Sequence, residues 1–194
     1  MKNSQGTSGQ VRTYQWGTSG RARGTGGFPV VTVTVLAVTA LFTTPQFFYP
    51  RLLTSLERQP GALVRDEWWR RFTPLLVHDG GWRQSSFNFP AIWVVGAVVQ
   101  RAFGGRAWLL LYLASGFIGE VAGYAWHPTG ASNSVAGAGL LGSCAVWMLL
   151  ELRRPQTAFG ALFILIGAAG LIYFHDPHGA PILCGAILGV ISSQ

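Results

Sequence analysis

The chain has 194 residues, of which 49% are hydrophobic and only 11% charged, and its mean hydropathy is +0.34. So few charges cannot cover so apolar a chain in water, which argues against an ordinary soluble domain. The formal net charge is +7, but the basic residues form no run longer than two, so we expect no nucleic-acid partner. The two cysteines, Cys144 and Cys184, lie in apolar stretches and offer neither a disulfide framework nor the spacing of metal ligands.

The apolar residues are concentrated after the first 28 positions. Residues 1–28 are rich in Gly, Ser, Thr and Gln and contain no acidic residue, which predicts a disordered, basic cytoplasmic tail. A bilayer core of about 30 Å requires about 20 apolar residues in a helix. On this measure residues 29–194 are predicted to form an all-α membrane domain, a bundle of six transmembrane helices. The predicted helices lie near residues 29–49, 85–104, 107–126, 132–150, 157–174 and 178–193.

The distribution of charge predicts the orientation of this bundle. With the N-terminus inside, the inner segments carry eight basic residues and one acidic residue, whereas the outer segments carry six and five. Short segments rich in Arg and Lys remain cytoplasmic. We therefore expect an integral protein of a bacterial-type inner membrane, with both termini in the cytoplasm.

One connection, residues 50–84, is much longer than the others. It interleaves Leu, Val, Trp and Phe with Arg and Glu, and it includes the adjacent pair Trp68 and Trp69. Aromatic side chains of this kind are typical of segments at the depth of the lipid headgroups. The connection is therefore predicted to lie in the membrane interface, and an ordinary aromatic anchor would account for the two tryptophans equally well.

A serine and a histidine are predicted to meet near the outer face. The fourth segment opens with the turn GASNSVAG at residues 130–137, which leaves backbone N–H groups free at a helix start. Small residues follow Ser132 at helical spacing, and Gly185 and Gly189 follow His178 in the sixth segment. Small residues allow two helices to approach closely, so packing of these two faces brings Ser132 towards His178.

Such a pair can carry out nucleophilic catalysis. The imidazole takes the hydroxyl proton as the serine attacks a carbonyl, and fixed donors stabilise the oxyanion that forms. The backbone amide of Ser132 and the side-chain amides of Asn88 and Gln84 could supply those donors. No aspartate is clearly placed to orient His178, which favours a dyad. In the alternative interpretation the serines only pack helices and the histidine only caps one.

Other polar residues have simpler interpretations. His78 is interpreted as a structural residue of the long connection. Asp176 is expected to cap the last helix or to orient His178, and capping is the commoner role. Glu120 is expected to form a hydrogen bond inside the bundle. The cluster of His175, Asp176 and His178 is a weak metal motif, so we expect no metal and no cofactor.

Four sequence blocks resemble the rhomboid family of intramembrane serine proteases. They are Glu67-Trp68-Trp69-Arg70 with Thr73, His78-Asp79-Gly80-Gly81-Trp82 leading to Phe87-Asn88, Gly130-Ala131-Ser132, and His178 with Gly185 and Gly189. The likeness runs over most of the chain after residue 50. It implies that Ser132 is the nucleophile, His178 the general base and Asn88 an oxyanion donor. It also implies that transmembrane segments of other proteins are the substrates.

Three positions depart from the family pattern. Asn133 stands where the family has Gly, Gln84 where active members have a second oxyanion-binding histidine, and Ala136 where an aromatic residue supports the histidine ring. These departures keep a second function open, namely a catalytically inactive rhomboid-like protein that binds client transmembrane helices. Ser134 is the alternative nucleophile. A transporter or channel is a third interpretation, for which Glu120 is the one acidic residue near midplane.

Overall fold

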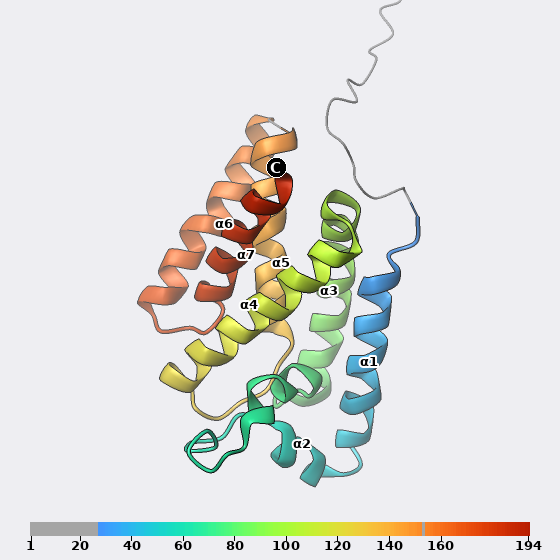
Figure 1. Ribbon diagram of the computed structural model, residues 1–194, viewed down its shortest axis with the longest axis vertical. Helices are drawn as coiled ribbons and strands as arrows, with labels where there is room; N and C mark the ends of the chain where they lie inside the picture. Colours follow the sequence, from blue (N-terminus) through green and yellow to red (C-terminus); the bar gives the residue numbers. More distant parts are fainter. Residues whose placement is uncertain (1–26, 153) are drawn as a thin grey trace, which may run out of the picture.

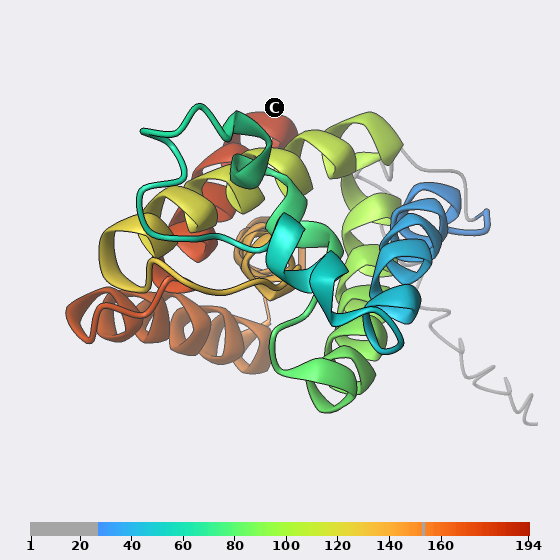
Figure 2. The same ribbon diagram turned by 90° about the horizontal axis from the view of Figure 1, so that it is seen from below.

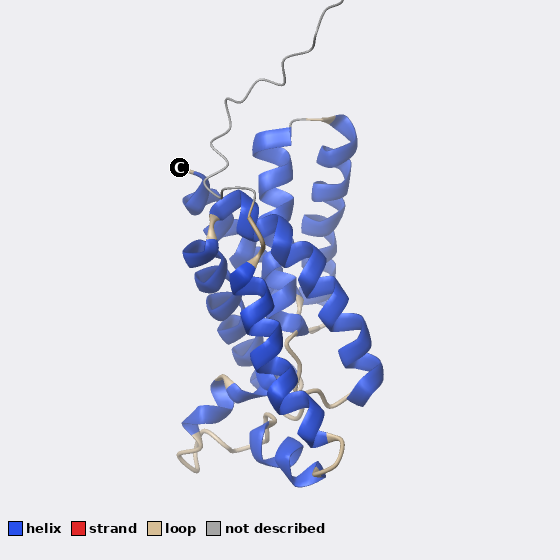
Figure 3. Cartoon of the chain, turned by 90° about the vertical axis from the view of Figure 1, so that its right-hand side faces the viewer, coloured by secondary structure: helices blue, strands red, loops and turns tan. Residues whose placement is uncertain are grey.

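The computed structural model describes residues 27–152 and 154–194. Over these residues the protein is helical and has no β-strand, as expected for the predicted all-α class (Figure 3). The elements are α1 (Val30–Gln46), α2 (Pro50–Leu56), η1 (Trp68–Arg71), η2 (Thr73–Leu76), α3 (Gly81–Phe103), α4 (Gly105–Trp126), α5 (Ser134–Trp147), η3 (Met148–Leu152), α6 (Pro155–Tyr173) and α7 (Gly179–Ser193). The predicted tail, residues 1–28, lies outside the described residues except for its last two positions.

Each of the six predicted apolar segments corresponds to a helix, but the helices differ in length and apolar character. Within the described residues, three stretches are long and apolar enough to cross a membrane, namely α4, α5 continued by η3, and α6. Helices α1 and α7 are apolar but shorter. Helix α3 has 23 residues and begins with the polar stretch GWRQSS. The structure thus supports an all-helical membrane domain, while the count of six transmembrane helices stays a prediction.

Helix α5 lies at the centre of the molecule. Figure 2 shows it end-on, with the other long helices around it. Its sequence consists almost entirely of small and apolar residues, and Ala136, Gly139 and Leu140 are buried. A helix surrounded on all sides must be apolar around its whole circumference, which this one is.

The closest packing in the bundle joins α5 to α7. A Cβ atom added to Gly142 would lie 1.9 Å from the carbonyl oxygen of Ile182, and one added to Gly185 would lie 1.9 Å from the carbonyl oxygen of Gly139. The two backbones are therefore in direct contact, as predicted from their small-residue faces. This contact holds the starts of α5 and α7 side by side.

Helix α6 lies at the outside of the bundle (Figure 1). It exposes large apolar side chains at helical spacing. Phe159, Phe163 and Ile166 are 74%, 72% and 70% exposed. So large a continuous apolar surface is unfavourable in water and suits contact with lipid.

Replacing Gly142 by Ala is expected to destabilise the protein, because the new methyl group would collide with the Ile182 carbonyl. Overpacking of this kind costs about 1–3 kcal/mol. Thermal unfolding in detergent would measure the loss. Gly167→Ala in α6 is the matched control, since a Cβ atom there has no neighbour within 4 Å. Equal Tm values for the two variants would contradict the packing of α5 against α7.

Candidate active site

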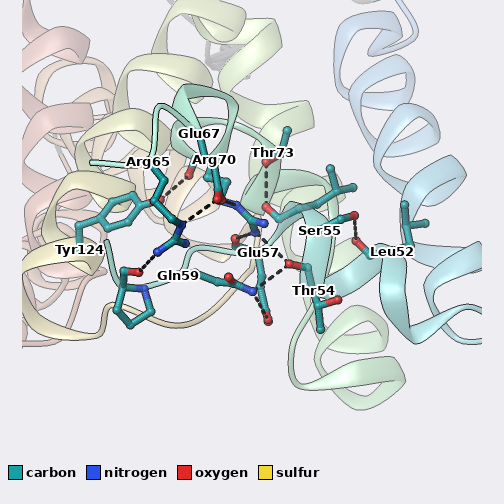
Figure 4. A network of polar contacts seen from close by, with 12 residues as sticks. Leu52, Thr54, Ser55, Glu57, Gln59, Arg65, Glu67, Arg70, Thr73 and Tyr124 are labelled. Carbon is teal, nitrogen blue, oxygen red and sulfur yellow. Dashed lines mark hydrogen bonds and ion pairs between the residues drawn. The ribbon is translucent and has the colours of Figure 1, made fainter. Parts of the chain in front are cut away.

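The long connection between α1 and α3 is ordered around one arginine. Arg70 is buried, and its Nη1 atom donates to the carbonyl oxygens of Thr54 at 2.9 Å and Glu57 at 2.6 Å (Figure 4). Its Nε atom is paired with the carboxylate of Glu67. Tyr124 of α4 donates its hydroxyl proton to the Arg70 carbonyl at 3.2 Å. The arginine thus joins two parts of the connection to each other and brings the connection onto α4.

A second arginine fixes the segment that leads to the serines. The Arg58 Nη1 atom lies 2.5 Å from the Glu120 carboxylate, and both side chains are buried. Its Nε atom donates to the carbonyl of His127 at 3.0 Å. Its backbone N–H donates to the Gly130 carbonyl at 2.9 Å. Arg58 is therefore the partner of Glu120 that the sequence left unnamed, and it holds in place the turn before Ser132.

The two serines and the histidine lie in a line at the starts of α5 and α7. The Ser134 Oγ atom lies 2.8 Å from the Nε2 atom of His178. Ser132 donates its hydroxyl proton to Ser134 Oγ at 2.7 Å. Its Oγ atom also accepts the backbone N–H of Ser134 at 3.0 Å, as in a serine turn that precedes a helix. This turn keeps the Ser132 hydroxyl away from the imidazole, so Ser134 stands between the predicted partners Ser132 and His178.

Of the two predicted side-chain donors, one lies against the serines. Asn88 is buried in α3, and its Nδ2 atom donates to Ser132 Oγ at 2.9 Å. Gln84, one turn earlier, instead accepts the backbone N–H of Gly80 at 3.0 Å through its Oε1 atom. No hydrogen bond joins Gln84 to either serine within the described residues. The structure therefore brings Asn88, but not Gln84, to the predicted nucleophile.

Asn133, another departure from the family pattern, lies in the interior. Asn133 is fully buried, and its Oδ1 atom lies 2.9 Å from His78 Nε2 and accepts from Asn88 Nδ2 at 3.1 Å. The other ring nitrogen of His78 lies 3.0 Å from the Thr43 hydroxyl of α1. Asn133 thus holds the side chain of Asn88 in place by a hydrogen bond, a role that the sequence did not indicate.

The environment of His78 favours its neutral form. The ring is fully buried, and burial lowers its pKa, although the hydrogen bond with Asn133 acts in the opposite direction. A neutral ring between Thr43 and Asn133 agrees with the structural role predicted for this residue.

An aspartate lies on the far side of His178. The Asp176 Oδ1 atom accepts the backbone N–H of His178 at 2.9 Å and lies 2.6 Å from its Nδ1 atom. Burial tends to raise the pKa of Asp176, but the hydrogen bonds from His178 outweigh it, and the pKa of the carboxyl group lies below its usual value. The sequence left open whether Asp176 caps the helix or orients the ring. Its carboxylate contacts both the backbone and the ring of His178, the N-cap residue of α7, and within the described residues no side-chain cap hydrogen bond is formed there. The spacing Asp-Pro-His was the signal for this contact.

The remaining candidates do not join this line of contacts. The His175 ring packs edge-on against Trp126, with 5.6 Å between the ring centroids. Ala136 is buried and packs near Gly116 of α4. In the part of the chain that the structure describes, no three His, Cys, Asp or Glu side chains are grouped so as to hold a metal ion.

Because His78 is buried in its neutral form, acid should weaken the fold. The unfolded chain binds a proton at this ring as the pH falls below about 6.5, whereas the folded chain resists it, so stability decreases as the pH decreases. Thermal unfolding in detergent between pH 7.5 and 5.5 would show this loss in the wild type and a shallower slope in His78→Gln. His127→Gln, which changes an exposed ring, is the control and should keep the wild-type slope. The same slope in all three proteins would contradict the assignment.

Comparisons with known proteins identify relatives of this chain. A family model described as Rhomboid domain matches residues 65–193. The chain is 36% identical over 83 residues, or 41% of its length, to the Rhomboid protease GluP of Bacillus subtilis (strain 168), and this match covers 16% of that relative. It is 30% identical over 95 residues, or 49% of its length, to the protein named "Putative rhomboid protease YdcA" of the same organism, of which 47% is covered. The chain thus spans less than half the length of each of these curated relatives.

Proposed function

Since the chain belongs to the rhomboid family, we propose that it is a serine endopeptidase that cleaves transmembrane segments of other proteins. Family membership and the apolar helices make it an integral membrane protein with an intramembrane-protease type of fold. The observation that carries the proposal is the hydrogen-bonded line of Ser132, Ser134 and His178, with Asn88 against the first serine. This line brings together a hydroxyl, an imidazole and an amide donor, the groups that a nucleophile, a base and an oxyanion donor require.

In the proposed reaction Ser132 attacks the carbonyl carbon of the scissile peptide bond. Its proton passes to Ser134 Oγ as the Ser134 proton passes to His178 Nε2, along contacts of 2.7 Å and 2.8 Å. The tetrahedral oxyanion forms two bonds away from Ser132 Oγ, on the carbon that Oγ attacks, where Asn88 and the N–H groups at the start of α5 can donate to it. His178 then gives the proton to the leaving nitrogen, and water hydrolyses the acyl-enzyme by the reverse route.

Ser134 remains the alternative nucleophile, because its hydroxyl contacts His178 directly. If it attacks, its proton passes to the imidazole in one step, and Ser132 becomes a donor beside it. The choice between the two serines rests on Asn88, which contacts Ser132. We therefore assign Ser132 as nucleophile in the proposal.

The proposed substrate is a membrane-embedded peptide that enters from the lipid near the outer face. The serines and His178 lie at the starts of α5 and α7, which are directed toward the end of the bundle that carries α2 and the long connection (Figure 1). With both termini in the cytoplasm, this end faces outward, as the charge distribution predicts. The location is then the inner membrane of a bacterial cell.

A catalytically inactive, client-binding relative is the second candidate, and one observation favours it. Gln84 is turned to Gly80, so Asn88 is the one predicted side-chain donor that reaches Ser132. Loss of one oxyanion donor can lower kcat by about 100-fold or more. Such a protein would bind transmembrane helices without cutting them.

Labelling with a fluorescent fluorophosphonate tests for the nucleophile. We expect an adduct on Ser132, found by mass spectrometry, and its loss in Ser132→Ala and His178→Ala. Ser134→Ala should label Ser132 much more slowly, because the proton of Ser132 reaches His178 through Ser134. An adduct on Ser134 would instead move the nucleophile there, and a folded wild-type protein without any adduct would favour the client-binding function.

The two predicted donors can be separated by their variants. Asn88→Ala should lower kcat for a peptide substrate by about 100-fold with little change in KM, because the donor acts on the transition state. Gln84→Ala, one turn away on the same helix, should change kcat by less than about threefold, because Gln84 contacts Gly80. Equal losses in both variants would show that Gln84 also reaches the oxyanion.

A further inference from the structure

Both ring nitrogens of His178 have hydrogen-bonding partners. On one side, Nε2 of His178 contacts Ser134 at 2.8 Å. On the other side, Nδ1 contacts Asp176 at 2.6 Å. We propose that Asp176 is a positioning residue that fixes the tautomer of His178 and so sets the direction of proton transfer from the serines. This inference rests on the proposed function and extends its serine and histidine by a third residue.

The tautomer follows from the chemistry of the carboxylate. An ionised carboxylate only accepts hydrogen bonds, so the proton of the ring must be on Nδ1. In the neutral ring Nε2 is then left as an acceptor, which is the state that a general base requires. The low pKa of Asp176 keeps the carboxylate ionised at neutral pH.

With the Nδ1 proton fixed, the donor and the acceptor of every hydrogen bond from Asn88 to His178 are determined. Since Nε2 accepts, Ser134 donates to it, and the Ser134 oxygen is free to accept the proton of Ser132. Ser132 in turn accepts from the amide of Asn88, which can only donate from Nδ2. With an acceptor at one end and a donor at the other, the serine proton can move only towards His178.

The position of Asp176 is itself fixed by the last turn of α6. Its backbone N–H donates to the Leu171 carbonyl at 2.8 Å, and that of His175 donates to Ile172 at 3.0 Å. His175 has a φ of 57°, in the left-handed region, as is common where a helix ends. Pro177 then restricts the step to His178. The carboxylate is therefore anchored by α6, while the imidazole that it orients belongs to the start of α7.

A turn that only leads into α7 would not require the contact with the ring. The Asp176 Oδ1 atom accepts the backbone N–H of His178 at 2.9 Å, as in an Asx turn, and the same oxygen also lies 2.6 Å from Nδ1. Few other charges face the pair. His127 acts on Asp176 electrostatically, His175 packs against Trp126, and α5 presents the uncharged Ser134. Asp176 is thus the one carboxylate in contact with His178 among the described residues.

Asp176→Asn is the discriminating variant, because it keeps the shape of the side chain and the oxygen that accepts the His178 N–H but removes the charge. We expect kcat for a peptide substrate to fall by up to about 10,000-fold with little change in KM, the loss that the same substitution causes in a serine protease with an Asp-His-Ser triad. The acidic limb of the rate profile should move to lower pH, since the imidazolium loses its neutralising carboxylate. Glu57→Gln is the matched control: it removes one charge from the long connection, has no contact with His178, and should leave rate and profile unchanged.

A second measurement reads the ring directly and does not depend on activity. Nitrogen-15 NMR of the histidine side chains should show the His178 proton on Nδ1 in the wild type and a redistribution towards Nε2 in Asp176→Asn. His127→Gln removes the signal of a neighbouring histidine and so helps to assign the signal of His178.

Two results would overturn the role of Asp176, namely a wild-type rate and pH profile in Asp176→Asn, or a wild-type ring protonated on Nε2. A wild type with Nδ1 protonated but no cleavage and no labelling would overturn the proposed function alone, and the orienting contact would stand.

Discussion

Helices α5 and α7 approach so closely that a side chain on Gly142 or Gly185 would meet the backbone of the other helix. In lipid, the hydrophobic effect does not drive two apolar helices together. Such contacts depend instead on close van der Waals packing between small residues. Here the packing also sets the register of the two helix starts. Ser134 is the first residue of α5 and His178 directly precedes α7, so the contact between the helices determines the contact between the side chains. Sites built on helices are positioned more precisely than sites on loops, so this contact fixes the relative position of Ser134 and His178.

The polar residues around the site form two separate supports. Arg58 bonds to Glu120 and to the backbone at Gly130, and so fixes the turn that precedes the serines. The second support is the hydrogen-bonded pair of Asn133 and His78, which holds the side chain of Asn88. Both are buried, where an unpaired polar group would be costly. Stability and the geometry of the site therefore depend on the same contacts.

Much of this arrangement follows from local patterns in the sequence. Apolar stretches predicted the helices. The small residues that follow Ser132 and His178 at helical spacing predicted the close approach of α5 to α7. The order of the two serines was not predictable, because the turn of the Ser132 hydroxyl onto the backbone of Ser134 decides which hydroxyl contacts His178. The pairing of Arg58 with Glu120 joins residues far apart in the chain and has no local signal. Gln84 was expected to donate to the oxyanion together with Asn88, but its side-chain oxygen is hydrogen-bonded to the backbone of Gly80.

Hydrolysis of a peptide bond in a membrane-embedded segment can be observed by reconstituting the protein in lipid vesicles with a single-span reporter and determining the masses of the products. We expect two fragments, cut within or beside the apolar segment, with wild-type protein and none with His178→Ala. An intact reporter that is nevertheless retained by folded wild-type protein would contradict the proposed cleavage and establish a client-binding relative.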